Sequence, residues 1–236
     1  MAMSTIDIHI SGWTMMASVS SLSLSTENPL ICSNKFSKVL EPISNMSFNP
    51  PSSVQVTSRQ IPKWERIPNT SIQSKPLLIY HKAFTASPSE LSARFEQAGE
   101  VIPQWVYSMY KQTHFHSTTH EVLGVVSGRA RLCFGGEQNP GRVEPIVEKG
   151  DLIIVPAGVG HRLLDDLGPN DSFTMVGAYP HGKDWDMCYG RPGEEGNIKN
   201  IENLEWFHGD PLYGTDERIV VLKTPDPMPQ ACEKSI

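Results

Sequence analysis

Short apolar stretches, separated by turns rich in Gly and Pro, dominate the second half of the chain. Residues 122–126 are almost all apolar, which is typical of a strand covered on both faces, whereas residues 129–134 alternate polar with apolar side chains. Similar patterns predict further strands at residues 76–80, 105–110, 143–147, 152–155, 162–164 and 173–178. Short strands at even spacing favour an all-β sandwich or barrel, and because the sequence has no internal repeat we expect one barrel.

One helix is predicted before this series of strands. The residues Ser-Pro-Ser-Glu at 87–90 combine an N-cap, a Pro at the first helical position and a capping-box Glu. Leu91, Phe95 and Ala98 then share one apolar face, and Gly99 ends the pattern. The spacing therefore predicts an amphipathic helix of about three turns.

The start of the chain differs from the rest, being rich in Ser, Asn, Thr and Met with weak periodicity. We expect residues 1–60 to form a largely disordered extension, residues 61–200 to form the barrel domain, and residues 201–236 to form an irregular tail packed on or beside it. No Lys or Arg precedes Lys35, so the positive start of a secretory signal is missing and a cytoplasmic location is expected. A targeting address within the extension stays open as an alternative.

Composition narrows the class of protein. The 236 residues are 39% hydrophobic and 19% charged, which fits a soluble globular domain with a sizeable core. A net charge of -6 without a basic cluster argues against a nucleic-acid partner, and no apolar run reaches membrane-spanning length. Cys32, Cys133, Cys188 and Cys232 form no Cys-x-x-Cys pair, which favours a reducing compartment over a disulfide framework.

The candidate chemistry is concentrated in the stretch His-Phe-His-Ser-Thr-Thr-His-Glu at residues 114–121. It places His114, His116, His120 and Glu121 within eight residues, and His161 follows a later Gly/Pro-rich turn. Imidazole and carboxylate groups together suit Zn, Fe, Mn, Ni or Cu rather than Ca or Mg. The sequence therefore predicts a site for one divalent transition metal.

The spacing indicates how four of these side chains converge. Residues two apart on a strand point to the same face, so His114 and His116 project together. A turn after His116 changes the parity before Glu121, and a turn at residues 156–158 places His161 at the start of the next strand. Three imidazoles and one carboxylate leave about two positions of a six-coordinate metal open for water or substrate.

His120 admits two interpretations. In a regular strand it faces away from Glu121, which favours a supporting histidine outside the ligand set. The alternative is that His120 replaces or supplements Glu121 as a ligand. Tyr110 and Arg131 are candidates to line the cavity.

An irregular stretch from residue 179 onward includes a loop at residues 182–193 with two aromatic residues, Trp185 and Tyr189. Such an aromatic either pins its loop to the barrel or forms a lid over the site. Asp184 and Asp186 flank Trp185, and we expect them to serve hydrogen bonds within the loop rather than catalysis.

The two histidine segments resemble the two signature motifs of the cupin superfamily, written G(X)5HXH(X)3-4E(X)6G and G(X)5PXG(X)2H(X)3N. The first motif is matched at His114, His116, Glu121 and Gly128, and the second at Gly150, Pro156, Gly158 and His161. Ser108 stands at the leading Gly of the first motif, and Asp165 stands at the closing Asn of the second. The resemblance implies a single jelly-roll-like cupin barrel with metal ligands at His114, His116, Glu121 and His161. It also makes His120 and Asp165 candidates for hydrogen bonding around the ligands.

The subgroup of small single-domain bacterial and fungal cupins is the most similar, and some relatives are described as oxidoreductases. The resemblance implies a metal-dependent, dioxygenase-like oxidoreductase that acts on a small chelating or enolic substrate. Fe(II) is the favoured metal, and Mn, Ni and Zn are the alternatives. Two alternatives stay open: a non-redox isomerase, lyase or decarboxylase, and a non-catalytic cupin that binds a small ligand. A homodimer formed through the outer strands is a further expectation from the resemblance.

Overall fold

The computed structural model describes residues 47–169 and 172–215. These residues form strands β1 (Gln55–Arg59), β2 (Leu77–His81), β3 (Val101–Tyr107), β4 (Glu121–Ser127), β5 (Arg129–Phe134), β6 (Ile146–Glu148), β7 (Leu152–Val155), β8 (His161–Asp166) and β9 (Thr174–Pro180). They also form helices α1 (Pro88–Ala98) and α2 (Glu195–Ile201), with short 3-10 turns at Pro51–Ser53 and Asn69–Ser71. Apart from β1, each strand overlaps one predicted from the sequence, although β3 begins and ends earlier than expected and β6 is shorter and begins later.

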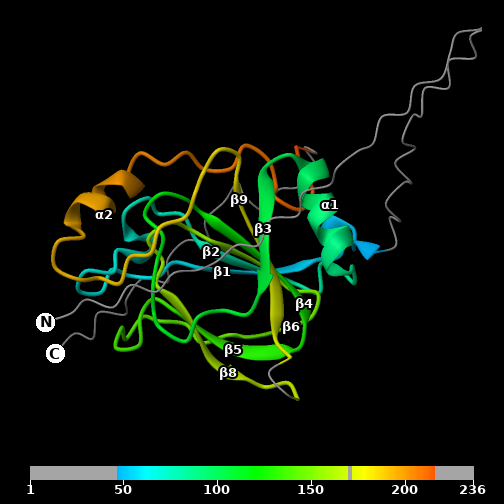
Figure 1. Ribbon diagram of the computed structural model, residues 1–236, viewed down its shortest axis with the longest axis horizontal. Coiled ribbons are helices and arrows are strands. Elements are labelled where there is room, and N and C mark those ends of the chain that lie inside the picture. The colour runs from blue at the N-terminus through cyan, green and yellow to red at the C-terminus, as the bar shows by residue number, and fades with distance from the viewer. Residues whose placement is uncertain (1–46, 170–171, 216–236) are drawn as a thin grey trace, which may run out of the picture. The chain divides into compact units, whose positions relative to one another are not determined.

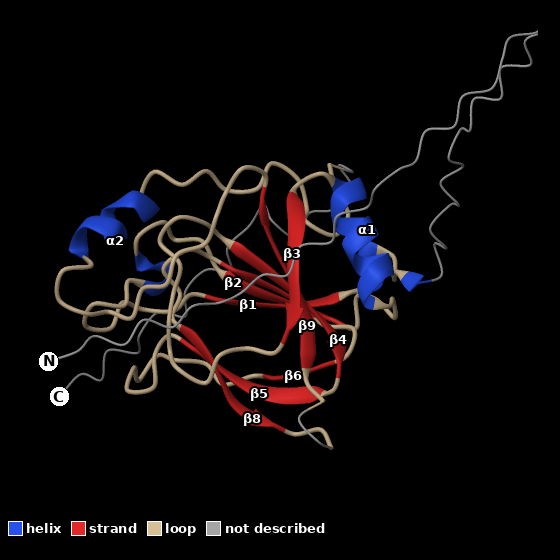
Figure 2. Ribbon diagram, viewed as in Figure 1, coloured by secondary structure: helices blue, strands red, loops and turns tan. Residues whose placement is uncertain are grey.

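The strands are arranged in two sheets, as Figure 1 and Figure 2 show. The larger sheet has the order β1-β2-β7-β4-β9-β3, and the smaller has the order β6-β5-β8. Every pairing within the two sheets is antiparallel. The predicted all-β, jelly-roll-like fold is confirmed, with the difference that the described strands form two facing sheets rather than one closed barrel.

The central strands of the large sheet, β2, β7, β4 and β9, are buried on both faces, which explains their continuous apolar runs. On β2, Leu77 and Ile79 belong to a core shared with the small sheet, whereas Leu78 and Tyr80 belong to a second core on the outer face. This alternation follows from the two-residue repeat of a strand. The inner core extends to Leu132 and Phe134 of β5, so apolar side chains fill the space between the two sheets.

Helix α1 covers the outer face of the large sheet, on the side away from β5 and β8 (Figure 2). Its predicted capping box is present: Glu90 N–H donates to Ser87 Oγ, and Ser87 N–H donates to the Glu90 carboxylate. The predicted face is confirmed, since Leu91 and Phe95 are fully buried. A Cβ at Gly124 of β4 would lie 2.3 Å from Leu91 Cδ2, so this glycine allows the helix to approach the sheet closely.

Two segments that were expected to lack regular structure contain a strand and a helix. Strand β1 lies within the segment 1–60 that was expected to be disordered, and it pairs with β2 from Gln55 to Arg59. Its apolar positions, such as Val56, pack on the outer core, which the Ser-rich composition of the segment concealed. Helix α2 likewise lies in a stretch that was expected to be irregular. The rest of the predicted extension, residues 1–46, lies outside the described residues.

The described part of the predicted tail packs on the domain. Phe207 and Leu212 join the outer core, and Asp210 accepts a hydrogen bond of 2.7 Å from the hydroxyl of Tyr80. Residues 216–236 of that tail lie outside the described residues. Within the described ranges, no helix is both long enough and apolar enough to span a membrane.

Candidate metal centre

His114 and His116 lie on an extended segment that enters the space between the two sheets. Backbone hydrogen bonds join His114 to His161 in both directions, at 3.2 and 2.8 Å. Phe115 points the opposite way, into a small apolar cluster with Cys188. The two-residue repeat expected for His-x-His is therefore present, and it brings His114 and His116 to the same side as His161.

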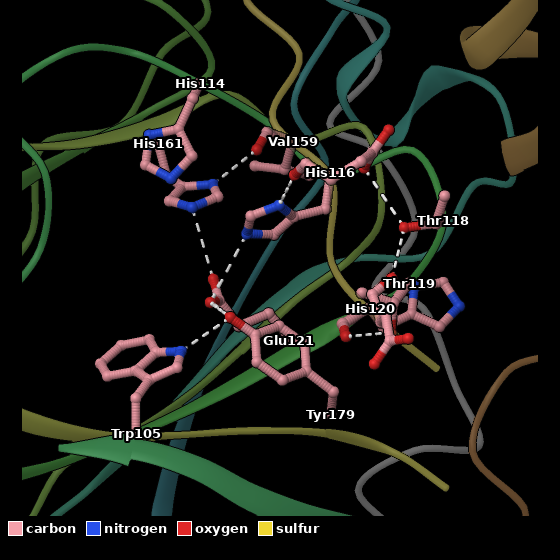
Figure 3. Close-up of polar contacts among 12 residues, drawn as sticks. Trp105, His114, His116, Thr118, Thr119, His120, Glu121, Val159, His161 and Tyr179 are labelled. Carbon is pink, nitrogen blue, oxygen red and sulfur yellow. Dashed lines mark hydrogen bonds and ion pairs between the residues drawn. The ribbon is translucent and has the colours of Figure 1, made fainter. Parts of the chain in front are cut away.

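Each of the three imidazoles is oriented by a backbone carbonyl, and Figure 3 shows the contact of His161 with Val159. The Nδ1 atoms of His114, His116 and His161 lie 3.0, 2.5 and 2.9 Å from the carbonyl oxygens of Gln112, Asp186 and Val159, respectively. A carbonyl accepts only, so each Nδ1 carries the proton and each Nε2 keeps a free lone pair. One ligand nitrogen from each ring lies within 4.8 Å of the others.

Glu121 stands beside these nitrogens at the start of β4. Its Oε1 lies 3.5 Å from His116 Nε2 and accepts a 2.7 Å hydrogen bond from the hydroxyl of Tyr179. Its Oε2 lies 3.3 Å from His161 Nε2 but has no hydrogen-bond donor, although it is fully buried. A buried carboxylate oxygen without a donor is costly unless a cation satisfies it.

The electrostatics of the cluster favour neutral rings at His114 and His161 and an ionised carboxylate at Glu121. Burial lowers the pKa of His161 to about 3, with a further contribution from His114, and burial also lowers the pKa of His114. Burial opposes the charge on His116, but the Glu121 carboxylate outweighs it and raises the pKa of that imidazole. Burial likewise opposes ionisation of Glu121, yet the neighbouring His116 and the Tyr179 hydroxyl lower its pKa.

These donors fit a divalent transition metal. Three unprotonated Nε2 atoms and one carboxylate oxygen are the ligand types that Fe, Mn, Ni and Zn share. The carbonyls that hold each Nδ1–H supply the outer hydrogen bonds that metal-binding histidines normally make. The unsatisfied Oε2 of Glu121 is the atom that a metal would complete. The residues at this site therefore fit a divalent transition metal.

His120 lies on the opposite face of β4 from Glu121 and away from the cluster (Figure 3). Its Nδ1 accepts a 2.9 Å hydrogen bond from the backbone N–H of Ala157, and its ring contacts Trp206 at a centroid distance of 4.7 Å. Burial lowers the pKa of His120 to about 4, so the ring is neutral. The structure thus places His120 in the outer core, where it holds the turn that precedes His161.

Asp165 does not lie at the site, contrary to the expectation from the second motif. Its carboxylate accepts a 2.9 Å hydrogen bond from Nε of Arg131, and both side chains are exposed on the small sheet. The cause is a register shift between the pairs Arg131–Asp165 and Leu132–Leu163, which inserts an extra residue into β8 and turns Asp165 outward. Arg131 is therefore also absent from the described cavity wall.

The loop with Trp185 is attached to the ligand segment. The carbonyl of Asp186 orients His116, and its carboxylate accepts hydrogen bonds of 2.7 and 2.6 Å from the backbone N–H and hydroxyl of Ser117. Asp186 therefore makes loop hydrogen bonds, as expected, and its backbone carbonyl also holds the ring of His116. Trp185 itself faces the site, with its ring 6.1 Å from that of His116.

A cavity of about 200 Å³ opens beside the histidines. Besides the four site residues it is lined by Trp105, Tyr107, Ser108, Met109, Tyr110, Leu123, Met175, Tyr179, Trp185 and Met187. The expectation for Tyr110 is met, but the sequence did not reveal Trp105 or Tyr179. The burial of β3 alternates in part, but β9 is buried from Met175 to Tyr179, so no alternation marks the side chains that face the cavity. Which face each strand presents depends on its register.

Trp105 and Tyr179 are linked to Glu121 by consecutive hydrogen bonds (Figure 3). Trp105 Nε1–H donates to the Tyr179 oxygen at 2.9 Å, and the Tyr179 hydroxyl donates to Glu121 Oε1 at 2.7 Å. Burial and the nearby carboxylate raise the pKa of Tyr179, so the phenol keeps its proton. The indole thus fixes the direction in which the phenol donates.

Comparison with known proteins agrees with this fold. A family model for the cupin domain matches residues 107–176, which include every proposed ligand. The uncharacterized protein YjlB of Bacillus subtilis (strain 168) is 35% identical over 158 residues, which cover 66% of this chain and 90% of YjlB.

Solved structures give weaker likenesses. A mutant of Bacillus subtilis oxalate decarboxylase aligns at 18% identity and a TM-score of 0.29, over 48% of this chain and 27% of that one. Acireductone dioxygenase from Bacillus anthracis, with a cadmium ion in its active centre, aligns at 21% identity and a TM-score of 0.30, over 43% of this chain and 63% of that one. Likenesses of this extent carry no inference about activity. From the domain match across both motifs and the match along 90% of YjlB, we conclude that the chain belongs to the cupin superfamily.

Proposed function

We propose that this protein is a metal-dependent oxidoreductase of the dioxygenase type, with Fe(II) as its metal and a small chelating or enolic molecule as its substrate. The observation that carries the proposal is the Glu121 carboxylate, whose buried Oε2 has no donor and lies 3.3 Å from His161 Nε2, while its Oε1 lies 3.5 Å from His116 Nε2. With His114 this makes a donor set of three imidazoles and one carboxylate, and it leaves the cavity side free for substrate.

When bound, Fe(II) supplies redox chemistry and polarises oxygen-containing ligands as a Lewis acid. In a dioxygenase-type reaction both atoms of O2 enter the substrate, whose own electrons reduce O2, so no external reductant is required. One negative charge from Glu121 leaves the site with a net charge near +1, which suits an anionic or enolic group.

The protein's own residues hold the three imidazoles and the Glu121 carboxylate in position. Carbonyls of Gln112, Asp186 and Val159 fix the imidazoles before any metal arrives, so the donor geometry is preorganised. The three histidines and Glu121 are themselves buried, which strengthens the electrostatic interactions among them. Tyr179 donates to Oε1 of Glu121, which leaves Oε2, near His161 Nε2, without a donor from the protein.

The test is oxygen consumption by protein that has been loaded anaerobically with Fe(II) and then mixed with enolic, catecholic and thiol substrates. The proposal predicts uptake that needs both iron and substrate and that disappears in the Zn(II)-loaded protein. Equal turnover with redox-inert Zn(II) would instead support a non-redox isomerase, lyase or decarboxylase. The absence of turnover with either metal would support a cupin that only binds its ligand.

A further inference from the structure

The cavity beside the three histidines has walls without fixed charge. Apart from the histidines and Glu121, its described lining consists of aromatic, methionine, leucine and serine side chains. Within that lining there is no Lys, Arg or Asp side chain, and Glu121 is the sole carboxylate. A charged group on the body of a ligand would therefore lose its hydration without gaining a partner.

The size of the cavity restricts the ligand further. Its volume of about 200 Å³ is slightly above the roughly 150 Å³ of an apolar cavity known to bind benzene. It is below the range of about 300–1,000 Å³ that is typical of sites for drug-sized molecules. The space therefore matches a single ring with short substituents.

Trp185 forms a fixed part of this wall. On one side of it, Thr118 Oγ1 donates a 2.6 Å hydrogen bond to the carbonyl of Asp184. On the other side, the backbone N–H of Ser117 donates a 2.7 Å hydrogen bond to the carboxylate of Asp186. The indole remains 42% exposed while it lines the cavity, so it stands where the cavity meets solvent. A flat apolar surface in this place suits the face of a ring.

We infer that the cavity binds a molecule whose body is one uncharged ring and whose head is a pair of adjacent metal-chelating oxygens, with Trp185 as the specificity-determining residue for the ring. The chelating head rests on the proposed function. The preference for an uncharged ring rests on the cavity walls alone. A small dicarboxylate is disfavoured, because its second charge would meet Met, Leu and aromatic side chains.

The inference is tested by calorimetric titration of Zn(II)-loaded protein, in which binding is measured without turnover. Benzohydroxamate, acetohydroxamate and 4-carboxybenzohydroxamate share one chelating head and differ only in the body. Burial of a phenyl ring contributes about 1.5–3 kcal/mol, which corresponds to roughly 10- to 100-fold in affinity. Benzohydroxamate should therefore bind at least about ten-fold more tightly than acetohydroxamate and than its carboxylated analogue. Equal affinities for the three probes would overturn the inference.

A matched set of variants tests whether Trp185 is responsible for the preference for an aromatic ring. Trp185→Ala should weaken benzohydroxamate binding about ten-fold and leave acetohydroxamate binding unchanged, whereas Trp185→Phe should retain most of the affinity. Trp64→Ala removes an indole from a separate surface groove and should change neither value. Equal weakening of both probes in Trp185→Ala would contradict a role in selecting the ring.

Phenol, a ring without the chelating head, separates this inference from the proposed function. Its binding is followed by NMR in metal-free His116→Ala protein and in metal-loaded wild type. Binding of phenol to metal-free His116→Ala would show that the ring site does not depend on the metal. If phenol binds but wild-type protein takes up no metal, the ring site stands and the metal-dependent function fails. If phenol binds to neither protein, the ring site is wrong, whatever the metal content.

Discussion

The hydroxyl of Tyr179 donates a 2.7 Å hydrogen bond to Oε1 of Glu121, while Oε2 of the same buried carboxylate has no donor. One oxygen is thus held by the protein and the other is left for a ligand. Trp105 supports the arrangement, because its indole N–H occupies the Tyr179 oxygen and directs the phenolic proton to Glu121. The two oxygens of Glu121 therefore have different roles.

Tyr179→Phe removes the hydroxyl and should weaken metal binding. Loss of an outer hydrogen-bond partner of a metal ligand typically costs about 10- to 100-fold in affinity. We expect a change of that order in the Kd for Zn(II), together with an altered visible spectrum of Co(II)-loaded protein. The control is Tyr107→Phe, which removes a hydroxyl from a 66% exposed residue of the same cavity. Identical Kd values and spectra for the two variants would rule out this role for Tyr179.

His120 should prove structural rather than metal-binding. His120→Asn keeps an acceptor oxygen near the position of Nδ1, so the hydrogen bond from Ala157 N–H can persist and the metal content should stay at the wild-type value. His120→Ala leaves a buried N–H unpaired and should lower the free energy of unfolding by about 1–3 kcal/mol. Chemical denaturation and elemental analysis measure the two effects. Loss of metal in correctly folded His120→Asn would instead make His120 a ligand.

How far the sequence predicts this site depends on whether a contact is local. The His-x-His spacing and the turn before His161 place three imidazoles together, and two of their carbonyl partners, Gln112 and Val159, lie only two residues away in the chain. The Tyr179–Glu121 contact instead needs the register of β4 against β9, in which Val122 pairs with Ala178. A one-residue change of that register would turn Tyr179 away, and no local pattern fixes it.

The fold shows the same division. The capping box of α1 and the alternation on β5 use neighbouring residues, and both were predicted. Strand β1 was missed because its stability comes from pairing with β2 and from packing on a core that is assembled elsewhere in the chain. Asp165 was misplaced because the register shift opposite Arg131 is a property of two strands, not of one motif.

Gly177 should be intolerant of a side chain. A Cβ at this position would lie 2.0 Å from Cε2 of Trp105, so Gly177→Ala must displace the indole that supports Tyr179. We expect the free energy of unfolding to fall by about 1–3 kcal/mol, as for other overpacked cores. Gly196→Ala is the matched control, since a Cβ there meets nothing within 4 Å. Equal stability of the two variants in urea denaturation would contradict the packing seen at Trp105.

The Tyr80–Asp210 pair predicts a pH dependence away from the metal site. Burial raises the pKa of Asp210, although its oxygens accept hydrogen bonds from Tyr80 and from the backbone of Leu212 and Tyr213. A carboxyl group with a higher pKa in the folded state binds more protons when folded. Its contribution to the free energy of unfolding therefore falls as pH rises from about 3.9, the unperturbed value, through the raised pKa.

Asp210→Asn keeps the shape and removes the charge, so it isolates this effect. The stability of Asp210→Asn relative to wild type should increase as pH rises through that window and then become constant. Urea denaturation at several pH values from 4 to about 8 measures the difference. A difference that stays constant or shrinks as pH rises would show that burial does not raise the pKa of Asp210.

The central claim is that His114, His116 and His161, with Glu121, hold one metal ion. The most direct measurement is elemental analysis of wild-type protein and of His116→Ala, both purified without a chelating tag and incubated with Fe(II) under anaerobic conditions before desalting. The account predicts about one metal ion per wild-type chain and a large loss in the folded variant, because one of four ligands is removed. Equally low metal content in both proteins, or equal retention by both, would contradict it.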